Sequence, residues 1–382
     1  MKSLRPFLFS AIIVIGFFGF IETFLHLSGF QPTISYKKIS IPAWMGEFDP
    51  IVLAKYQKFI SDYKYINEDA YAYQPDLRYD YLLKPGLNLS VSNYSSSVFI
   101  DKLPAWTIAS DSQGNRISAE NPDENGINKE GKTIHVLGDS SSFGWGVNFE
   151  ESYPQQLASK LSQFRITSRV VIKNYSTPGF SSFQGRLLLE DKVEIKRGDI
   201  ALVSFGFNDS YESMKPDREY FQNRNSLPGK ISWYLNRLLM VRGLRAFFHS
   251  FRIPIVLETD NRRVSLSEYR ENLGYIFSKV LKNGGKPLFV NICNGEQYSE
   301  VAEKVSKNFK IPFFNFPEEF KPYLSKVHDI YPEKFVAYYE AYGDLMEKKP
   351  QLAFLFPDYC HPNAIGHRLI ADVILKERDA FK

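Results

Sequence analysis

Downstream of residue 131, runs of buried-type apolar residues alternate with segments of helical periodicity, and this alternation constrains the fold more than any other feature. Apolar runs of strand length occur at residues 133–137, 170–174, 200–205, 287–291 and 311–314. Helical stripes begin near Pro154, after Ser267 and after Asn363. Strands that alternate with helices form a mostly parallel sheet with helices on both faces. We therefore expect a three-layer α/β/α fold around a five-stranded parallel sheet.

Two other regions depart from this alternation. Residues 31–131 are rich in Pro, Asn, Ser and Tyr and have weak helical periodicity, which predicts an irregular, β-containing extension. Strand candidates within it are 87–91 and 97–100, and residues 120–131 have the composition of a surface linker. Residues 210–265 are predicted to form a helical insertion in a main domain that covers 132–382.

The first 30 residues form a separate apolar segment. The run 7–21, extended by 24–30, is just long enough to cross a bilayer core of about 30 Å. A cleaved signal peptide and a buried helix are the alternatives, but no Ala-x-Ala-like cleavage site follows. We favour a single-pass anchor. Lys2 and Arg5 favour a cytoplasmic N-terminal tail and an extracytoplasmic, such as periplasmic, main domain, although Lys37 and Lys38 weaken this topology.

Composition argues against several classes of function. The net charge of +4 is spread along the chain without a Lys/Arg block, so we expect no nucleic-acid partner. Two cysteines cannot build a four-cysteine zinc site or a disulfide-dense scaffold. His367 has no third ligand that would pair it with His361, and His135 lies within the first strand as a core residue. We expect neither a metal nor a cofactor.

Polar segments follow four of the five predicted strands. Gly138-Asp139-Ser140 follows the first, residues 174–179 follow the second, and 206–209 follow the third. A loop with Asp358 and His361 follows the fifth and leads into the last helix. Each segment alone is as well explained by a turn or a helix N-cap. Because sites in α/β sheets form at the carboxyl ends of the strands, their conjunction predicts one catalytic site.

These residues have the chemistry of acyl transfer. The Ser140 hydroxyl needs a base to take its proton during attack on a carbonyl, and His361 is suited to that task at neutral pH. Asp358 can orient the imidazole and stabilise its charged form. The backbone amides of Ser140 and Gly179 and the side-chain amide of Asn208 are the candidate oxyanion-hole donors.

The downstream part of the chain, roughly 132–380, resembles the SGNH (GDSL-type) hydrolase superfamily, whose four sequence blocks contribute Ser, Gly, Asn and His. Here these fall on Ser140, Gly179, Asn208 and His361, with Asp358 in the Asp-x-x-His position. The resemblance implies a flavodoxin-like fold and ester hydrolysis or acyl transfer without a metal. The segments 73–76, 84–86 and 112–116 also resemble N-terminal extensions of membrane-anchored bacterial members.

We therefore expect a serine esterase that hydrolyses an acyl ester, such as an acetyl ester, of a carbohydrate or envelope component. An O-acyltransferase with the same residues is the main alternative, because the second acceptor is not evident from the sequence. A non-catalytic module that binds a glycan or a partner is a further alternative, against which the intact residue set argues.

Three further patterns have more than one interpretation. Cys360 directly precedes His361, and Cys293 lies at the end of the fourth strand. In an oxidising compartment they could form a disulfide that pins the histidine loop, but we favour two separate, half-buried thiols. Asp139 is expected to brace its turn, and Asp209 to cap or brace the next segment. Arginines 237, 242, 245 and 252 could touch a membrane or an acidic glycan, but we favour the solvated face of a packed insertion.

Overall fold

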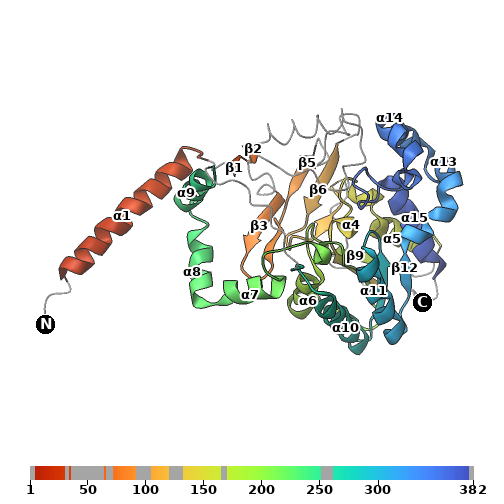
Figure 1. Ribbon diagram of the computed structural model, residues 1–382, viewed down its shortest axis with the longest axis horizontal. Helices are drawn as coiled ribbons and strands as arrows, with labels where there is room; N and C mark the ends of the chain where they lie inside the picture. Colours follow the sequence, from red (N-terminus) through yellow and green to blue (C-terminus); the bar gives the residue numbers. More distant parts are fainter. Residues whose placement is uncertain are drawn as a thin grey trace. The chain divides into compact units, whose positions relative to one another are not determined.

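The computed structural model describes residues 5–30, 34–35, 64–65, 72–91, 105–119, 132–164, 170–250 and 261–377 (Figure 1). The strand candidate 97–100, the linker 120–131 and Arg252 lie outside these ranges. The chain divides into two compact units. One unit joins Met1–Tyr71 to Phe221–Val256, and the other joins Ala72–Tyr220 to Leu257–Lys382.

The larger unit contains an eight-stranded sheet among its described residues, in the order β12-β11-β10-β8-β9-β7-β6-β5. Its strands are β5 (Asn88–Val91), β6 (Trp106–Ser110), β7 (Arg116–Ile117), β8 (Lys132–Gly138), β9 (Val170–Asn174), β10 (Ile200–Ser204), β11 (Lys286–Asn291) and β12 (Phe313–Asn315). The strands β8 to β12 are mutually parallel, so the predicted α/β fold with five parallel strands is confirmed.

The complete sheet is larger than expected, because three strands of the upstream segment continue it. β7 pairs antiparallel with β9 through Arg116 and Asn174, and β6 and β5 follow antiparallel. An edge strand exposes unpaired backbone N–H and C=O groups, and this addition covers the edge of β9 at Asn174. A separate hairpin, β3 (Tyr73–Asp76) and β4 (Asp80–Leu83), belongs to the same unit.

Helices cover both faces of the sheet. They are α4 (Ser140–Phe143), η4 (Phe149–Glu151), α5 (Tyr153–Gln163), α6 (Ser182–Asp191), η5 (Asn208–Ser210), α10 (Leu266–Lys282), α11 (Glu296–Phe309), α12 (Phe316–Glu319), η6 (Lys321–Lys326), α13 (Val327–Ile330), α14 (Pro332–Lys348), η7 (Pro350–Ala353) and α15 (Ala364–Lys376). Helix α5 packs on α15, and α10 packs on α6 and α11. The three helices expected from Pro154, Ser267 and Asn363 correspond to α5, α10 and α15.

The smaller unit contains α1 (Arg5–Leu27), β1 (Ile34–Ser35), β2 (Lys64–Tyr65), α8 (Leu227–Leu235) and α9 (Leu239–Ser250). Helix α7 (Asp217–Asn225) runs from the larger unit into the smaller one. The segment Leu8–Leu27 of α1 has a mean hydropathy of 2.2 and no buried part, and it is long and apolar enough to cross a membrane. By length and composition alone, α1 meets the requirement for an anchor or a signal sequence.

Candidate active site

The turn after β8 presents Ser140 at the first position of α4. The Asp139 side chain caps this helix by accepting a hydrogen bond from the Ser141 amide at 2.9 Å. A side chain at Gly138 would place its Cβ 2.7 Å from the Ser142 Cβ and 3.0 Å from the Ser204 carbonyl oxygen. Glycine is therefore required where the strand turns into the helix. Asp139 has the bracing contact that the sequence predicted.

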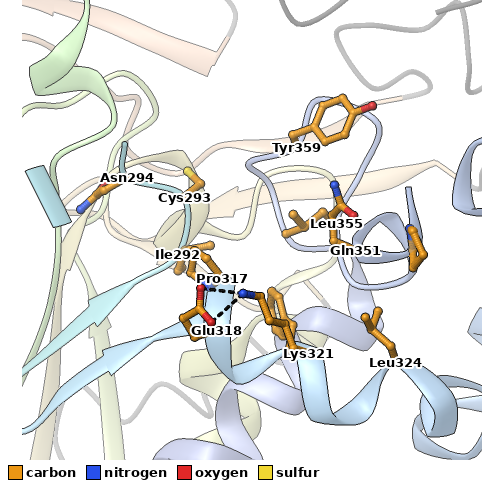
Figure 2. Close-up of a pocket in the computed structure, with 12 residues that line it drawn as sticks. Ile292, Cys293, Asn294, Pro317, Glu318, Lys321, Leu324, Gln351, Leu355 and Tyr359 are labelled. Carbon is orange, nitrogen blue, oxygen red and sulfur yellow. Dashed lines mark hydrogen bonds and ion pairs between the residues drawn. The ribbon is translucent and has the colours of Figure 1, made fainter. Parts of the chain in front are cut away.

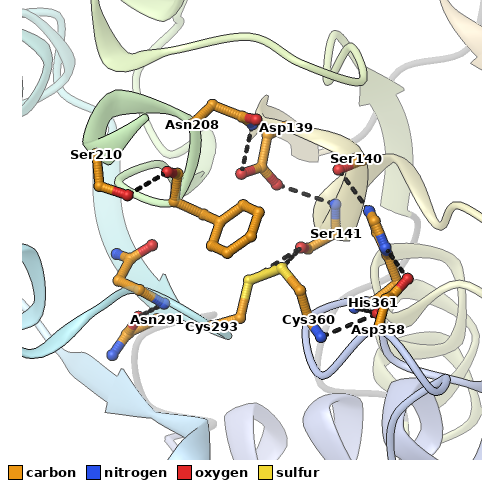
Figure 3. Close-up of a disulfide and its surroundings, with 12 residues drawn as sticks. Asp139, Ser140, Ser141, Asn208, Ser210, Asn291, Cys293, Asp358, Cys360 and His361 are labelled. Atoms are coloured by element: carbon orange, nitrogen blue, oxygen red, sulfur yellow. Dashed lines mark hydrogen bonds and ion pairs between the residues drawn. A yellow bond between two sulfur atoms is a disulfide. The ribbon is translucent and has the colours of Figure 1, made fainter. Parts of the chain in front are cut away.

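Three predicted site residues lie in one hydrogen-bonded chain (Figure 3). The Ser140 Oγ lies 2.7 Å from the Nε2 of His361, although the two residues are 221 positions apart. The Nδ1 of His361 lies 2.6 Å from the Asp358 Oδ2. The other Asp358 oxygen accepts the backbone amides of Cys360 at 3.0 Å and of His361 at 2.9 Å. With its Nδ1–H bonded to Asp358, His361 has its Nε2 lone pair directed at the Ser140 hydroxyl.

The charges near the Ser140–His361–Asp358 hydrogen bonds favour the protonated imidazole of His361. Burial of His361 opposes its charge, but the charge and hydrogen bond of Asp358, with the charge of Asp139, outweigh burial and raise the pKa of His361 above 6.5. Burial also raises the pKa of Asp139 to about 6. The imidazole therefore accepts a proton more readily than a solvent-exposed histidine does, as a general base requires.

The candidate oxyanion donors follow β8, β9 and β10. Gly179 has a φ of 81°, a conformation that favours glycine. The Asn208 side-chain amide donates to the Asp139 carboxylate and to the Phe180 carbonyl, both at 3.2 Å. The side chain of Asn208 therefore links the neighbour of Ser140 to the neighbour of Gly179. That Ser140, Gly179 and Asn208 together form an oxyanion hole stays a prediction.

Two residues that sequence reasoning missed hold the Gly179 loop. The Tyr81 hydroxyl donates to the Pro178 carbonyl oxygen at 2.7 Å, and Arg263 donates to the Gly179 carbonyl oxygen at 2.7 Å. Arg263 is itself held by an ion pair with Asp217 at 2.9 Å. Tyr81 comes from the weakly patterned extension, and Arg263 lies near the end of the predicted insertion, residues 210–265. No motif in the sequence distinguishes either of them from an ordinary surface residue.

Asp209 has the bracing role that the sequence predicted. Its carboxylate accepts the backbone N–H of Ser182, the first residue of α6, at 3.0 and 3.1 Å, and it also accepts the Ser182 hydroxyl. Burial raises the pKa of Asp209 to about 7. Asp209 thus joins the turn after β10 to the start of the helix after β9.

Cys293 and Cys360 form a disulfide, so the favoured interpretation of two separate thiols is wrong. Their Cα atoms are 5.0 Å apart, within the range that a disulfide spans. The Ser141 Oγ lies 3.8 Å from the Cys293 sulfur and 3.6 Å from that of Cys360. The bond therefore ties the end of β11 to the residue before His361, directly beside Ser141 in the turn after β8 (Figure 3).

A cavity of about 760 Å³ lies beyond this disulfide, at the carboxyl ends of β11 and β12 (Figure 2). Its lining is mainly apolar and includes Ile292, Cys293, Pro317, Phe320, Leu324, Pro350, Leu355 and Tyr359. Asn294 and Gln351 add polar groups, and Lys321 pairs with Glu318 at 2.7 Å along one wall. Because Tyr359 lies between Asp358 and Cys360, the histidine loop forms part of the cavity wall.

The remaining histidine candidates have structural partners. The Nε2 of His135 lies 3.0 Å from the Asp199 carboxylate in the core, as expected of a packed residue. The Nδ1 of His367 accepts the Tyr153 amide at 3.3 Å, and burial lowers the pKa of His367 to about 3. Within the described ranges, no group of three or more His, Cys, Asp or Glu side chains could hold a metal ion.

Comparison with solved structures finds hydrolases of low sequence identity. An α/β hydrolase from the metagenome of Lake Arreo, Spain, is 16% identical, with 66% of this chain and 96% of that chain covered and a TM-score of 0.40. A lipase/acylhydrolase from Enterococcus faecalis is 14% identical, with coverages of 64% and 94% and a TM-score of 0.37. An acetyl xylan esterase from Geobacillus stearothermophilus is 15% identical, with coverages of 65% and 94% and a TM-score of 0.38.

A comparison with curated proteins finds no match. The sequence pattern of the GDSL-like Lipase/Acylhydrolase family, by contrast, matches residues 136–369. This range is more than half of the chain, and it contains the nucleophile turn and the histidine loop. The chain therefore belongs to the GDSL-like lipase/acylhydrolase family of SGNH hydrolases, and it is an ester-hydrolysing enzyme.

Proposed function

We propose that this enzyme is a serine esterase in which Ser140, His361 and Asp358 form the catalytic triad. The observation that carries the proposal is the continuous contact from the Ser140 Oγ to His361 at 2.7 Å and from His361 to Asp358 at 2.6 Å. A serine without a base is a poor nucleophile at neutral pH, and this geometry supplies both the base and the group that orients it.

The mechanism follows from these contacts. The Ser140 oxygen attacks the ester carbonyl while its proton passes to the Nε2 of His361, and Asp358 stabilises the imidazolium. Collapse of the tetrahedral intermediate breaks the bond to the alcohol, which takes the proton from Nε2. A water molecule, deprotonated by the same nitrogen, then attacks the acyl-enzyme. Collapse of this second intermediate breaks the bond to the Ser140 oxygen, which takes the proton back from Nε2, and the acid is released.

The negative charge of the intermediate would be stabilised by the amides of Ser140 and Gly179 and by the side chain of Asn208. Removal of a single donor of this kind costs about 2.7–4 kcal/mol of transition-state stabilisation in enzymes with an oxyanion hole. The positive φ of Gly179 supports this assignment, and Asn208 would exchange one of its 3.2 Å hydrogen bonds, to Asp139 or to the Phe180 carbonyl, for a bond to the oxyanion.

We propose an acyl ester of a carbohydrate or another envelope component as the substrate. The cavity of about 760 Å³ supports this class, because it would hold a sugar-sized group and its wall includes Tyr359 of the histidine loop, although neither Ser140 nor His361 lines it. Tyr359 would offer a ring for stacking, and Asn294 and Gln351 would offer hydrogen bonds to hydroxyl groups. The acyl group itself would lie on the side of Ser140 and Asn208.

The apolar helix α1 supports a single-pass anchor, with the extension and the catalytic domain on the extracytoplasmic side. The disulfide beside His361 agrees with this placement, because disulfides persist in oxidising compartments. The proposal also divides the chain into three segments. These are an anchor in residues 1–30, an extension in residues 31–131 and a catalytic domain in residues 132–382.

The test uses the full chain in detergent and acetylated sugars, with acetate release as the measurement. Ser140→Ala should abolish release, whereas Ser176→Ala should leave it unchanged. Ser176 is a suitable control because it is buried at the end of β9 and its Oγ has no hydrogen-bond partner among the described residues. Full activity of Ser140→Ala would overturn the triad. Transfer of the acetyl group to an added sugar in preference to water would identify an O-acyltransferase instead.

A further inference from the structure

The Tyr81 hydroxyl binds the peptide unit that contains the Gly179 amide. It donates to the Pro178 carbonyl oxygen at 2.7 Å, and that carbonyl and the Gly179 N–H belong to one planar peptide group. The described residues contain no cis peptide bond, so the two groups point in opposite directions. A hydrogen bond to the carbonyl therefore fixes the direction of the Gly179 N–H and, by polarising the amide, makes it a stronger donor.

The neighbouring peptides are held in the same way. The Gly179 carbonyl accepts from Arg263 at 2.7 Å, and the Phe180 carbonyl accepts from Asn208 at 3.2 Å. Three consecutive carbonyls thus have donors from three different parts of the fold. The approach of Tyr81 is close enough that a Cβ at position 179 would lie 2.4 Å from its hydroxyl oxygen.

We propose that Tyr81 is a positioning residue of the oxyanion hole, which orients and polarises the Gly179 amide through the Pro178 carbonyl. The proposal rests on the assignment of Gly179 as an oxyanion donor. Tyr81 lies on β4, upstream of the residues 136–369 that the family pattern covers, so this function would be an addition by the N-terminal extension. Its effect should be confined to the transition state, because the oxyanion forms only there.

The variant Tyr81→Phe tests this function in the full chain. It keeps the ring contacts with Tyr73 and Phe180 and removes only the hydroxyl. We expect kcat per titrated active site to fall on the order of tenfold, with KM changed less than about twofold. The affinity for a trifluoromethyl ketone, which forms an oxyanion on the enzyme, should fall by the same factor as kcat/KM.

Tyr79→Phe is the matched control, because Tyr79 is in the same hairpin and its hydroxyl binds the Asp191 carboxylate at 3.0 Å. It should leave kcat and inhibitor affinity unchanged. Unchanged kcat and inhibitor affinity in Tyr81→Phe, or a rise in KM alone, would overturn the proposal. Failure of the triad would be distinguishable, because Ser140→Ala would then retain activity whatever the result at position 81.

A second, independent observation concerns residues 226–250 of the smaller unit. This segment contains Lys230, Arg237, Arg242 and Arg245 and no Asp or Glu. Its two helices carry apolar side chains that are 50–73% exposed: Leu227, Ile231, Tyr234, Leu235, Leu244, Phe247 and Phe248. The first four follow a spacing of one helix face, and so do the last three. Helix α8 has no buried residue, whereas α9 buries Leu239 and Ala246, so the expected packing of the insertion holds for α9 and not for α8.

The end of α1 is joined to the start of α9. The Glu22 carboxylate accepts the backbone N–H groups of Leu239 at 2.6 Å and Met240 at 3.0 Å, which caps α9 at its positive end. Glu22 lies five residues before the end of the apolar span at Leu27, or about 8 Å along the helix axis. A bilayer that contains α1 would therefore have its headgroup region at the level of α9.

We infer that α8 and α9 lie in the surface of a lipid bilayer, with their apolar faces among the acyl chains and their basic side chains at anionic headgroups. The inference rests on insertion of α1, and it adds a second membrane contact to the anchor. A helix with exposed apolar and basic faces gains stability in an interface, where each face meets its preferred surroundings.

The test places a spin label at single cysteines in the full chain, reconstituted in nanodiscs that contain anionic lipid. The native cysteines are bonded to each other and do not react. Labels at Ile231→Cys and Leu244→Cys should be accessible to oxygen and protected from a water-soluble nickel chelate. A label at Val336→Cys, an exposed position on α14, should be accessible to the chelate. Chelate access at 231 and 244 equal to that at 336 would overturn the inference, while a label at Ile13→Cys reports separately on insertion of α1.

Discussion

The buried guanidinium of Arg116 donates to the Gly144 carbonyl oxygen at 2.7 Å, directly behind the helix that presents Ser140. It also donates to the carbonyls of Phe143 and Val147, and it lies 4.4 Å from the centre of the Phe143 ring. Burial lowers the pKa of Arg116 to about 9, so the side chain stays charged at neutral pH. The upstream segment thus holds the carbonyls that follow Ser140 in place.

Arg116→Met should destabilise the protein by about 2–4 kcal/mol, because three buried carbonyls lose their donor. The measurement is denaturant unfolding of the full chain in detergent. Arg186→Ala is the control, since Arg186 forms a surface pair with Glu190 at 3.0 Å and should cost less than about 1 kcal/mol. Equal losses for the two variants would show that Arg116 does not support the turn.

The pH dependence of kcat/KM should report the pKa of His361. In the proposed triad the neutral ring would be the active base, and its pKa is raised above 6.5, so activity should fall as the pH drops through a value above 6.5. In Asp358→Asn, burial remains and the attraction of the carboxylate is lost, so the acid limb should move to lower pH and kcat should fall about 10²–10⁴-fold. If the acid limb of the kcat/KM profile stays at the same pH in Asp358→Asn, a group other than His361 controls the activity.

Reduction of the disulfide should weaken both the fold and the site. It closes a loop of 67 residues, for which loop-closure entropy predicts a contribution of about 4 kcal/mol. Because Cys360 precedes His361, kcat should fall together with stability when reductant is added. The double variant Cys293→Ser/Cys360→Ser should reproduce both losses and be insensitive to reductant. Equal activity with and without reductant would show that catalysis does not depend on the disulfide.

Asn208→Ala should lower kcat by about 10²–10³-fold with little change in KM, as loss of one oxyanion donor does. The burst amplitude of active-site titration controls for the fraction of folded enzyme. A rise in KM at unchanged kcat would assign Asn208 to substrate binding instead. A kcat equal to that of the unchanged protein would remove Asn208 from the site.

The sequence predicted the parallel strands and the approach of Ser140 to His361. Both predictions depend only on short sequence patterns, the apolar runs and the residues that directly follow them. Buried parallel strands are continuous apolar runs, and their observed ends agree with the prediction within two residues. Residues that follow such strands must meet at one edge of the sheet, whatever the intervening length.

The supporting residues could not be predicted in this way. Tyr81 and Arg116 lie on short strands whose apolar pattern is too weak to assign a register, and their partners are backbone carbonyls that carry no sequence signal. The pairing of Cys293 with Cys360 depends on the path of the histidine loop past the end of β11. Only the folded chain brings these groups together.

The most direct test of the triad is labelling of the full chain with a fluorophosphonate, followed by identification of the modified residue by mass spectrometry. The contact of 2.7 Å between Ser140 and His361 predicts one phosphonate per chain, on Ser140, with labelling lost in His361→Ala and retained in His135→Ala. Labelling of another residue, or labelling of Ser140 that is independent of His361, would contradict the account.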